Sequence, residues 1–316
     1  AFVRRVRTKS VLFLMDLATG VTRPVYDGLS KDQQEAWAIF GVYPNFSWLP
    51  DDSAIVFWSG GKIHSIDMAT LKVTNIPFEV ETTIKIAEKV HFKSPVAPDT
   101  FDAKVIRHAV TSPDGKTLVF TAVGHLWSKK LPNGKPKRLT KNTDLEAEPA
   151  FSPNGKELVF VTWNDENLGA IHRIPASGGT STKLSFEKGI YRTPSFSPTG
   201  KQITYRKESG NNDQGRTFAK RTGIYTMDAD GSNASLVSKN GEYPMFSTDG
   251  KRIFYQTGGT YFGNLTKYLK SVDLNGKDER SHVKSKYANR LVPSPDNKWI
   301  AFTNLHKAYI APLVLN

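Results

Sequence analysis

A short motif containing a proline turn recurs along the chain, and a strand-like apolar run follows it each time. Its clearest copy is Phe-Ser-Pro-Asn-Gly-Lys at residues 151–156, which precedes the run at 158–161. Three other copies keep this pattern closely, and two are looser. In chain order, the copies begin at Phe46, Thr111, Phe151, Phe196, Phe246 and Pro293.

The motif has the chemistry of a tight turn between two strands. Proline fixes φ near −65° at the second position of a type I turn, and Asp, Asn or Thr suits the third position. Glycine then supplies the left-handed residue that commonly completes such a hairpin connection. Because β-branched and aromatic residues come next, each copy predicts a strand, a turn and a second strand. The chain is therefore expected to be all-β.

The spacing of the motif predicts the architecture. Its serines lie at Ser47, Ser112, Ser152, Ser197, Ser247 and Ser294, at intervals of 65, 40, 45, 50 and 47 residues. A period of about 40–50 residues with four strands per repeat is typical of β-propeller blades. We therefore predict a β-propeller of four-stranded antiparallel blades. Six blades fit the length best, and seven blades with one truncated are the alternative.

The whole chain, residues 1–316, is predicted to be one propeller domain. Residues 1–28 hold only half a repeat, with strands expected at 11–16 and 21–26. The last blade, 289–316, ends after its third strand. Since propellers usually close by pairing an N-terminal strand with the last blade, we expect these two incomplete parts to pair.

Two insertions interrupt the repeats. Residues 79–105 contain an alternating strand pattern at Ile84–Ile86, and residues 206–222 predict a polar, hairpin-like surface loop. Residues 29–41 are expected to hold one short helical turn.

Composition and charge exclude several classes of site. The chain has no cysteine, which excludes disulfides and thiolate metal sites. No apolar window reaches the roughly 18 residues of a membrane helix, so no membrane span is expected. The formal charge of +13 comes from 43 Lys and Arg against 30 Asp and Glu. Because the lysines are spread evenly through the predicted turns, we expect no specific nucleic-acid binding.

One set of equivalent residues is a candidate ligand-binding site. These residues lie three positions before each motif, at the expected entry to the inner strand of each blade. Equivalent positions on inner strands converge at one mouth of the propeller channel, where mixed polar side chains can hold a polar ligand, a peptide or an ion. A solvated channel lining without any ligand is the alternative. The set is Tyr43, His108, Glu148, Thr193, Tyr243 and Arg290.

Catalytic and metal motifs are not found in the sequence. It has no Gly-x-Ser-x-Gly nucleophile elbow and no Gly-x-x-x-x-Gly-Lys phosphate loop. No two of the seven histidines lie within ten residues of each other, so no His-x-His pair exists. We predict no catalytic and no metal-binding residue in this chain. The aromatics at equivalent points of the second strands are expected to pack between blades: Phe57, Phe120, Phe160, Tyr205, Tyr255 and Phe302.

The Pro-Asp-Gly-Lys turns, with third strands such as residues 223–231, resemble the WD40-like repeats of the Tol-Pal periplasmic propeller. They are also similar to the propellers of tricorn and dipeptidyl-peptidase-type enzymes. Five further stretches look like the propeller of large exported bacterial amidohydrolases, in which a propeller precedes a metal-dependent barrel. These stretches are residues 36–44, 96–102, 190–198, 274–280 and 308–312.

The resemblance implies a non-catalytic propeller segment of a secreted amidohydrolase-like protein, which lacks the start of its propeller region and the catalytic barrel. Such a segment would act as a scaffold, a substrate gate or a module that binds peptide or protein, with an adjacent catalytic domain as a further partner. Zinc or another divalent metal is expected only in the missing domain. The alternatives are a stand-alone Tol-Pal-type binding propeller and a propeller hydrolase with an unrecognised channel site. The resemblance places the protein in the periplasm or outside the cell.

Overall fold

The computed structural model describes most of the chain as an all-β protein. The described residues are 1–6, 9–30, 45–88, 90–92, 95–208, 210–211, 216–217, 219–259, 265–304 and 306–314. Within these ranges the chain forms strands, turns and bends but no helix, and so no helix there is suited to cross a membrane. The chain divides into two compact units, one of residues 1–101 with 211–217 and one of residues 102–210 with 218–316.

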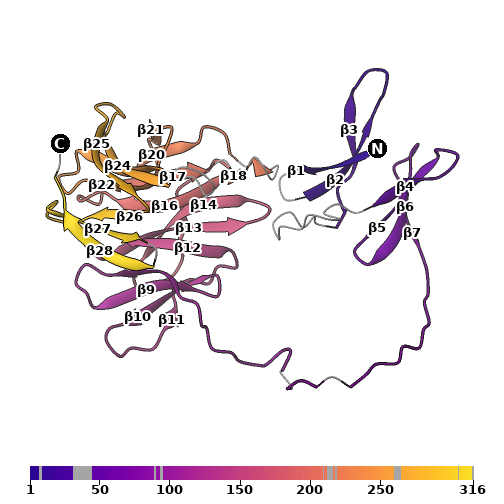
Figure 1. Cartoon of the computed structure of the whole chain (residues 1–316), viewed down its shortest axis with the longest axis horizontal. Coiled ribbons are helices and arrows are strands. Elements are labelled where there is room, and N and C mark those ends of the chain that lie inside the picture. The colour runs from indigo at the N-terminus through magenta and orange to yellow at the C-terminus, as the bar shows by residue number, and fades with distance from the viewer. Residues whose placement is uncertain are drawn as a thin grey trace. The chain divides into compact units, whose positions relative to one another are not determined.

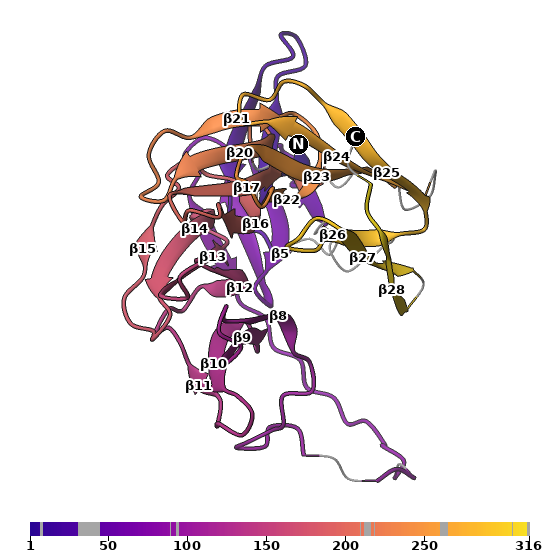
Figure 2. The same cartoon turned by 90° about the vertical axis from the view of Figure 1, so that its left-hand side faces the viewer.

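The second unit contains five sheets that follow one another along the chain, each antiparallel with its strands side by side in chain order. Figure 2 shows the first strand of each sheet towards the middle of this unit and, in the four-stranded sheets, the last strand at its outside. The first two sheets are β8 (Arg107–Thr111), β9 (Thr117–Ala122), β10 (His125–Lys130), β11 (Lys137–Arg138), and β12 (Leu145–Phe151), β13 (Glu157–Asn164), β14 (Leu168–Pro175), β15 (Thr182–Lys183). The third is β16 (Ile190–Phe196), β17 (Gln202–Glu208), β20 (Gly223–Asp228), β21 (Ser235–Ser238). The last two are β22 (Glu242–Phe246), β23 (Arg252–Gly258), β24 (Thr266–Asp273), β25 (Arg280–Lys286), and β26 (Asn289–Pro293), β27 (Trp299–Asn304), β28 (Lys307–Pro312).

The first unit contains one three-stranded and one four-stranded sheet (Figure 1). Leu12, Ile55, Phe57 and Ile66 form its buried core. Its strands are β1 (Phe2–Val6), β2 (Lys9–Met15), β3 (Thr22–Tyr26), and β4 (Phe46–Trp48), β5 (Ala54–Ser59), β6 (Lys62–Asp67), β7 (Val73–Ile76).

The repeated motif forms the predicted hairpin turn. At residues 112–117 the amide of Gly115, which has φ +70°, donates to the Ser112 carbonyl at 2.8 Å. The Ser112 hydroxyl donates to Asp114 Oδ1 at 2.5 Å and accepts from the Thr117 amide at 2.9 Å. Because the side chains of the serine and the third turn residue satisfy the turn's own polar groups, the turn is specified locally.

The apolar core of the second unit lies between consecutive sheets. Each cluster joins residues of one sheet to residues of the next, as stacked blades require. Three of the predicted aromatics, Phe160, Tyr205 and Tyr255, belong to these clusters, and Phe57 belongs to the buried core of the first unit. Phe120 is also buried, and Phe302 is partly exposed and packs against the cluster that contains Phe254. The clusters of the second unit centre on Leu126 with Phe160, Ile171 with Tyr205, Ile224 with Tyr255, and Phe254 with Leu291.

The structure corrects two expectations about local structure. Residues 84–86 were expected to be strand-like, but no strand lies between Ile76 and Arg107 in the described residues, and Ile84 and Ile86 are exposed. The alternating pattern there has no neighbouring strand to pair with. Conversely, β1 lies in a basic stretch for which no strand was predicted.

The insertion at 206–222 contains a short hairpin, β18 (Gly210–Asn211) and β19 (Arg216–Thr217). The helical turn expected at 29–41 falls almost entirely outside the described residues. The single-domain organisation, the pairing of the first strands with the last blade, and the number of blades stay predictions.

Candidate ligand-binding mouth

The first strands of all five sheets in the second unit share one irregularity. In each of them the pairing with the second strand skips two residues, which is the mark of a β-bulge. The first skipped residue in every strand has a positive φ although it is not glycine. These five bulge residues are His108 (51°), Glu148 (53°), Thr193 (46°), Tyr243 (51°) and Arg290 (50°).

The sequence favours a bulge at these places because proline follows three of the five residues, as Pro149, Pro194 and Pro244. Proline has no N–H to give to a sheet ladder, so it fits where the pairing is already interrupted. A left-handed backbone costs a residue with a Cβ about 1–2 kcal/mol. The same strained geometry, repeated in five blades, turns five side chains towards one place.

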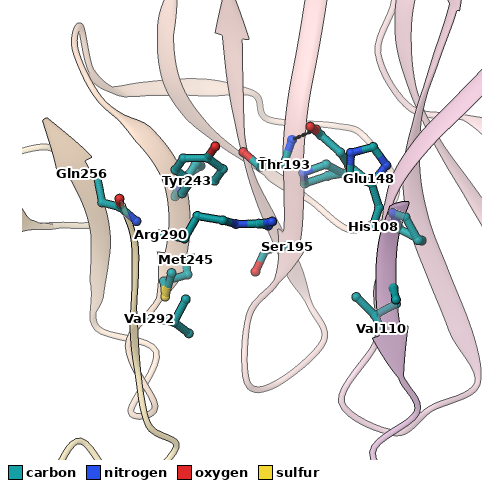
Figure 3. A pocket seen from close by; sticks show the side chains of 14 residues that line it. His108, Val110, Glu148, Thr193, Ser195, Tyr243, Met245, Gln256, Arg290 and Val292 are labelled. Atoms are coloured by element: carbon teal, nitrogen blue, oxygen red, sulfur yellow. Dashed lines mark hydrogen bonds between the residues drawn. The ribbon is translucent and has the colours of Figure 1, made fainter. Parts of the chain in front are cut away.

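The five bulge residues line one cavity of about 410 Å³, which we call the mouth cavity (Figure 3). Its volume lies within the range of about 300–1,000 Å³ that is usual for small-ligand pockets. The structure thus brings together five of the six residues singled out from the sequence, whereas Tyr43 lies outside the described residues. Whether the mouth cavity holds a ligand stays a prediction. Its other lining residues are Ala109, Val110, Pro149, Pro194, Ser195, Pro244, Met245, Gln256 and Val292.

One side of the mouth cavity holds a carboxylate whose charge is already paired. Glu148 Oε1 lies 2.8 Å from Arg192 Nη2, and Glu148 Oε2 accepts the Thr193 backbone amide at 2.5 Å (Figure 3). Only 9% of the Glu148 side chain is exposed. Beside it, the hydroxyl oxygen of Thr193 is buried and has no hydrogen-bond partner among the residues that the structure describes. This carboxylate orders the mouth across two neighbouring sheets.

The opposite side holds a cation without such a partner. The Arg290 guanidinium lies 5.4 Å from the centre of the Tyr243 ring, close enough for a cation–π contact. In the described part of the chain, no Asp or Glu forms an ion pair with Arg290. In Figure 3 its side chain extends across the cavity towards Ser195 and Thr193.

Gln256 is a lining residue that the sequence reasoning missed. It lies on β23, is only 1% exposed, and donates from Nε2 to the Leu291 carbonyl at 3.2 Å. Its Oε1 atom is buried and has no hydrogen-bond partner in the described part of the chain. The sequence did offer a signal, because Gln256 directly follows the apolar run Ile253–Tyr255 and is therefore expected to be buried. A buried amide side chain normally needs hydrogen-bond partners, which makes such a residue a candidate for a polar site.

His108 is held towards its neutral form. Burial lowers its pKa, and the nearby charges of Arg192, Arg290 and Arg107 lower it further, while Glu148 acts in the opposite direction. Its Nδ1 atom lies 3.4 Å from the Thr121 hydroxyl. A neutral imidazole can both donate and accept hydrogen bonds. The mouth cavity therefore offers a cation, a neutral ring and two unpartnered oxygens.

No group of three or more His, Asp or Glu side chains in the described residues is placed to hold a metal ion. The potential nucleophiles Thr193 and Ser195 line the mouth cavity, but no hydrogen bond between either hydroxyl and the His108 ring is seen in the residues described. The arrangement suits recognition by hydrogen bonds and charge.

Comparison with known proteins relates the chain to one class of propeller. Residues 103–273 match the family described as the tricorn protease N-terminal β-propeller domain. The Tol-Pal system protein TolB of Francisella tularensis subsp. holarctica is 29% identical over 193 residues, a match that covers 46% of this chain and 44% of that protein. The chain thus spans less than half the length of these curated relatives.

Among solved structures, a putative TolB from Agrobacterium tumefaciens superposes with a TM-score of 0.51 at 17% identity. The superposition covers 98% of this chain and 99% of that chain. This likeness concerns the fold, and together with the family match it confirms the predicted β-propeller class and the resemblance to Tol-Pal-type and tricorn propellers.

Proposed function

The chain belongs to the tricorn protease N-terminal β-propeller family, and we propose that it is a non-catalytic binding propeller of the TolB type that takes a protein or peptide at the mouth cavity. The observation that carries this proposal is the convergence of the five bulge residues on one cavity. Strained backbone positions persist only where the surrounding structure enforces them, and they cluster at functional sites. A solvated lining would not need the same strain in five consecutive blades.

The comparisons support a binding role better than a catalytic one. The curated relatives are named Tol-Pal system protein TolB, and this similarity supports a propeller that works by contact with other proteins. The same similarity supports a periplasmic location for this chain. The mouth cavity supports this role through its composition, since Tyr and Arg are enriched among the residues that dominate protein interfaces.

Selection of binders from a random peptide library, followed by calorimetric titration, tests the proposal. We expect the selected peptides to bind the native protein and to lose at least about tenfold in affinity, equal to about 1.4 kcal/mol, to a variant with His108→Ala, Glu148→Gln and Arg290→Gln. A control variant, Lys137→Gln with Lys183→Gln and Lys284→Gln, changes exposed residues of the outermost strands β11, β15 and β25. Unchanged affinity in the first variant would retire the proposed site.

An adjacent amidohydrolase domain is the second candidate context. It rests on the sequence stretches that look like the propeller of exported amidohydrolases, such as residues 274–280. The coding sequence downstream of Asn316 decides between the two: a barrel that opens with His-x-His favours this context, and a stop codon favours a separate binding propeller. Amidase or peptidase turnover by this chain with added zinc would instead favour the third alternative, a propeller hydrolase.

A further inference from the structure

The mouth cavity carries an imbalance of charge that points to the chemistry of its occupant. Among the described residues, Glu148 is the single carboxylate that lines the cavity, and it is engaged by Arg192 and by the Thr193 amide. Its single lining guanidinium, Arg290, contacts the Tyr243 ring and has no carboxylate partner among the described residues. One cation of the cavity is therefore left to pair with a group from outside.

The surroundings of Arg290 fit a planar anion better than a point charge. A guanidinium presents its N–H groups in a fixed fork that matches the two oxygens of a carboxylate. The contact with the Tyr243 ring restricts the guanidinium before a ligand arrives, which lowers the entropy lost on pairing. The Thr193 hydroxyl, buried and unpartnered, is a donor that an incoming oxygen can satisfy.

We infer that the mouth cavity binds the carboxylate of a peptide, with Arg290 as its anchor and the Thr193 hydroxyl as a second donor. The inference rests on the proposed function and adds to it the chemical class of the group that is recognised. The carboxylate can come from a peptide C-terminus or from an acidic side chain, and both present the same two oxygens.

Two further observations agree with this assignment. His108 stays neutral beside the guanidinium groups, so its ring can accept or donate a hydrogen bond without adding another charge. Gln256 lies at the cavity wall, and its buried Oε1 atom has no partner among the described residues, so a backbone N–H from a peptide is a donor that would satisfy it. The cavity thus combines one anchor for a carboxylate with an acceptor for the main chain that carries it.

Chemical-shift titration of the whole protein tests the inference with four small probes. N-acetyl-trialanine with a free carboxylate is compared with its C-terminal amide, and N-acetyl-Ala-Glu-Ala-amide is compared with the same peptide containing Gln. We expect carboxylate probes to shift the amide signals of Thr193, Ser195 and Met245 and to bind at least about tenfold more tightly than the uncharged counterparts. The pair with the larger preference identifies the source of the carboxylate.

Substitution of the anchor supplies the matched comparison. Arg290→Gln should abolish the preference for carboxylate probes, Arg290→Lys should keep part of it, and Arg138→Gln on the outermost strand β11 should leave it unchanged. Equal binding of charged and uncharged probes would overturn the inference while leaving the proposed peptide-binding function intact. Absence of any shift with all four probes would also overturn it, and the library selection would then judge the proposed function separately.

Discussion

Thr193 is the most strained of the five bulge residues, because it is β-branched and has a φ of 46°. Branching at Cβ restricts χ1 and makes the left-handed region especially unfavourable. Its backbone amide nevertheless donates to Glu148, and so the position is fixed by a contact between neighbouring sheets. The strain is a local cost that the fold accepts at this residue.

A pair of substitutions isolates this cost. We expect Thr193→Gly to be more stable than Thr193→Ala by about 1 kcal/mol, because glycine accepts the positive φ whereas alanine retains the 1–2 kcal/mol penalty of its Cβ. Both variants lose the hydroxyl, so their difference reports the backbone alone. Urea unfolding measures the free energy of unfolding of each.

The same pair at Thr204 on β17 serves as the control, since Thr204 is buried and does not have a positive φ. There we expect the ordinary order, with glycine less stable than alanine by about 0.5–1 kcal/mol. If glycine were also the less stable variant at position 193, the strain would not exist in solution.

At the scale of elements, the hairpin turn repeats with small chemical changes that make it a natural experiment. In the copy at 152–157 the third turn residue is Asn154, which accepts from Ser152 Oγ at 2.8 Å and from the Lys156 amide at 3.0 Å. Asp114, Asp249 and Asp296 accept the equivalent bonds in other copies. In each aspartate, the hydrogen bond from the serine hydroxyl is the main cause of a lowered pKa, assisted by the lysine amide.

A lowered carboxyl pKa makes stability depend on pH with a definite sign. The contribution is present above the unfolded pKa, near 3.8 for Asp, and is lost as the pH falls through the folded pKa. We therefore expect the variant Asp114→Asn, Asp249→Asn, Asp296→Asn to lose less stability than the native protein between about pH 7 and about pH 3. Denaturant unfolding at both pH values measures this difference.

Asn154→Asp is the converse variant. It places a carboxylate in the same hydrogen-bonded turn, and it should increase the loss of stability on acidification. A pH dependence that is identical in the native protein and both variants would show that these turn bonds do not favour the charged carboxylate.

These turns also explain how much of the fold the sequence could predict. The proline, serine and glycine of each turn are local signals. Their spacing along the chain predicted the repeated antiparallel sheets and five of the residues that line the mouth cavity. The strand β1 and the lining residue Gln256 were missed because neither follows the motif. The pattern at Ile84–Ile86 predicted a strand where the described structure has none, since alternation cannot report whether a partner strand exists.

On the scale of the whole molecule, the net positive charge of the chain and the Arg290 guanidinium of the mouth cavity both favour an anionic partner. The chain carries a formal charge of +13, and a net positive field attracts anionic partners over distances longer than a hydrogen bond. That field alone is not specific. Selection among anions would come from Arg290 and the polar atoms around it, which act only at contact distance.

The extended segment between β7 and β8 predicts where the chain is most open to proteolysis. Its described residues, 77–88, 90–92 and 95–106, form no strand, and nearly all of them are exposed. A backbone without ladder hydrogen bonds can enter a protease site without prior unfolding. We expect limited trypsin digestion to cut first in this segment, at Lys85 and Lys104, as measured by the masses of the fragments over time.

The lysines of the hairpin turns are the internal control for that digestion. Lys116, Lys156, Lys201 and Lys251 are exposed, like the two predicted sites, but their backbones belong to hydrogen-bonded turns between strands. Cleavage there requires local opening of a sheet, which adds a free-energy cost to each cut. First cuts at the turn lysines would mean that the segment between β7 and β8 is covered in solution, whereas first cuts at Lys85 and Lys104 would establish it as the most accessible connection between the sheets.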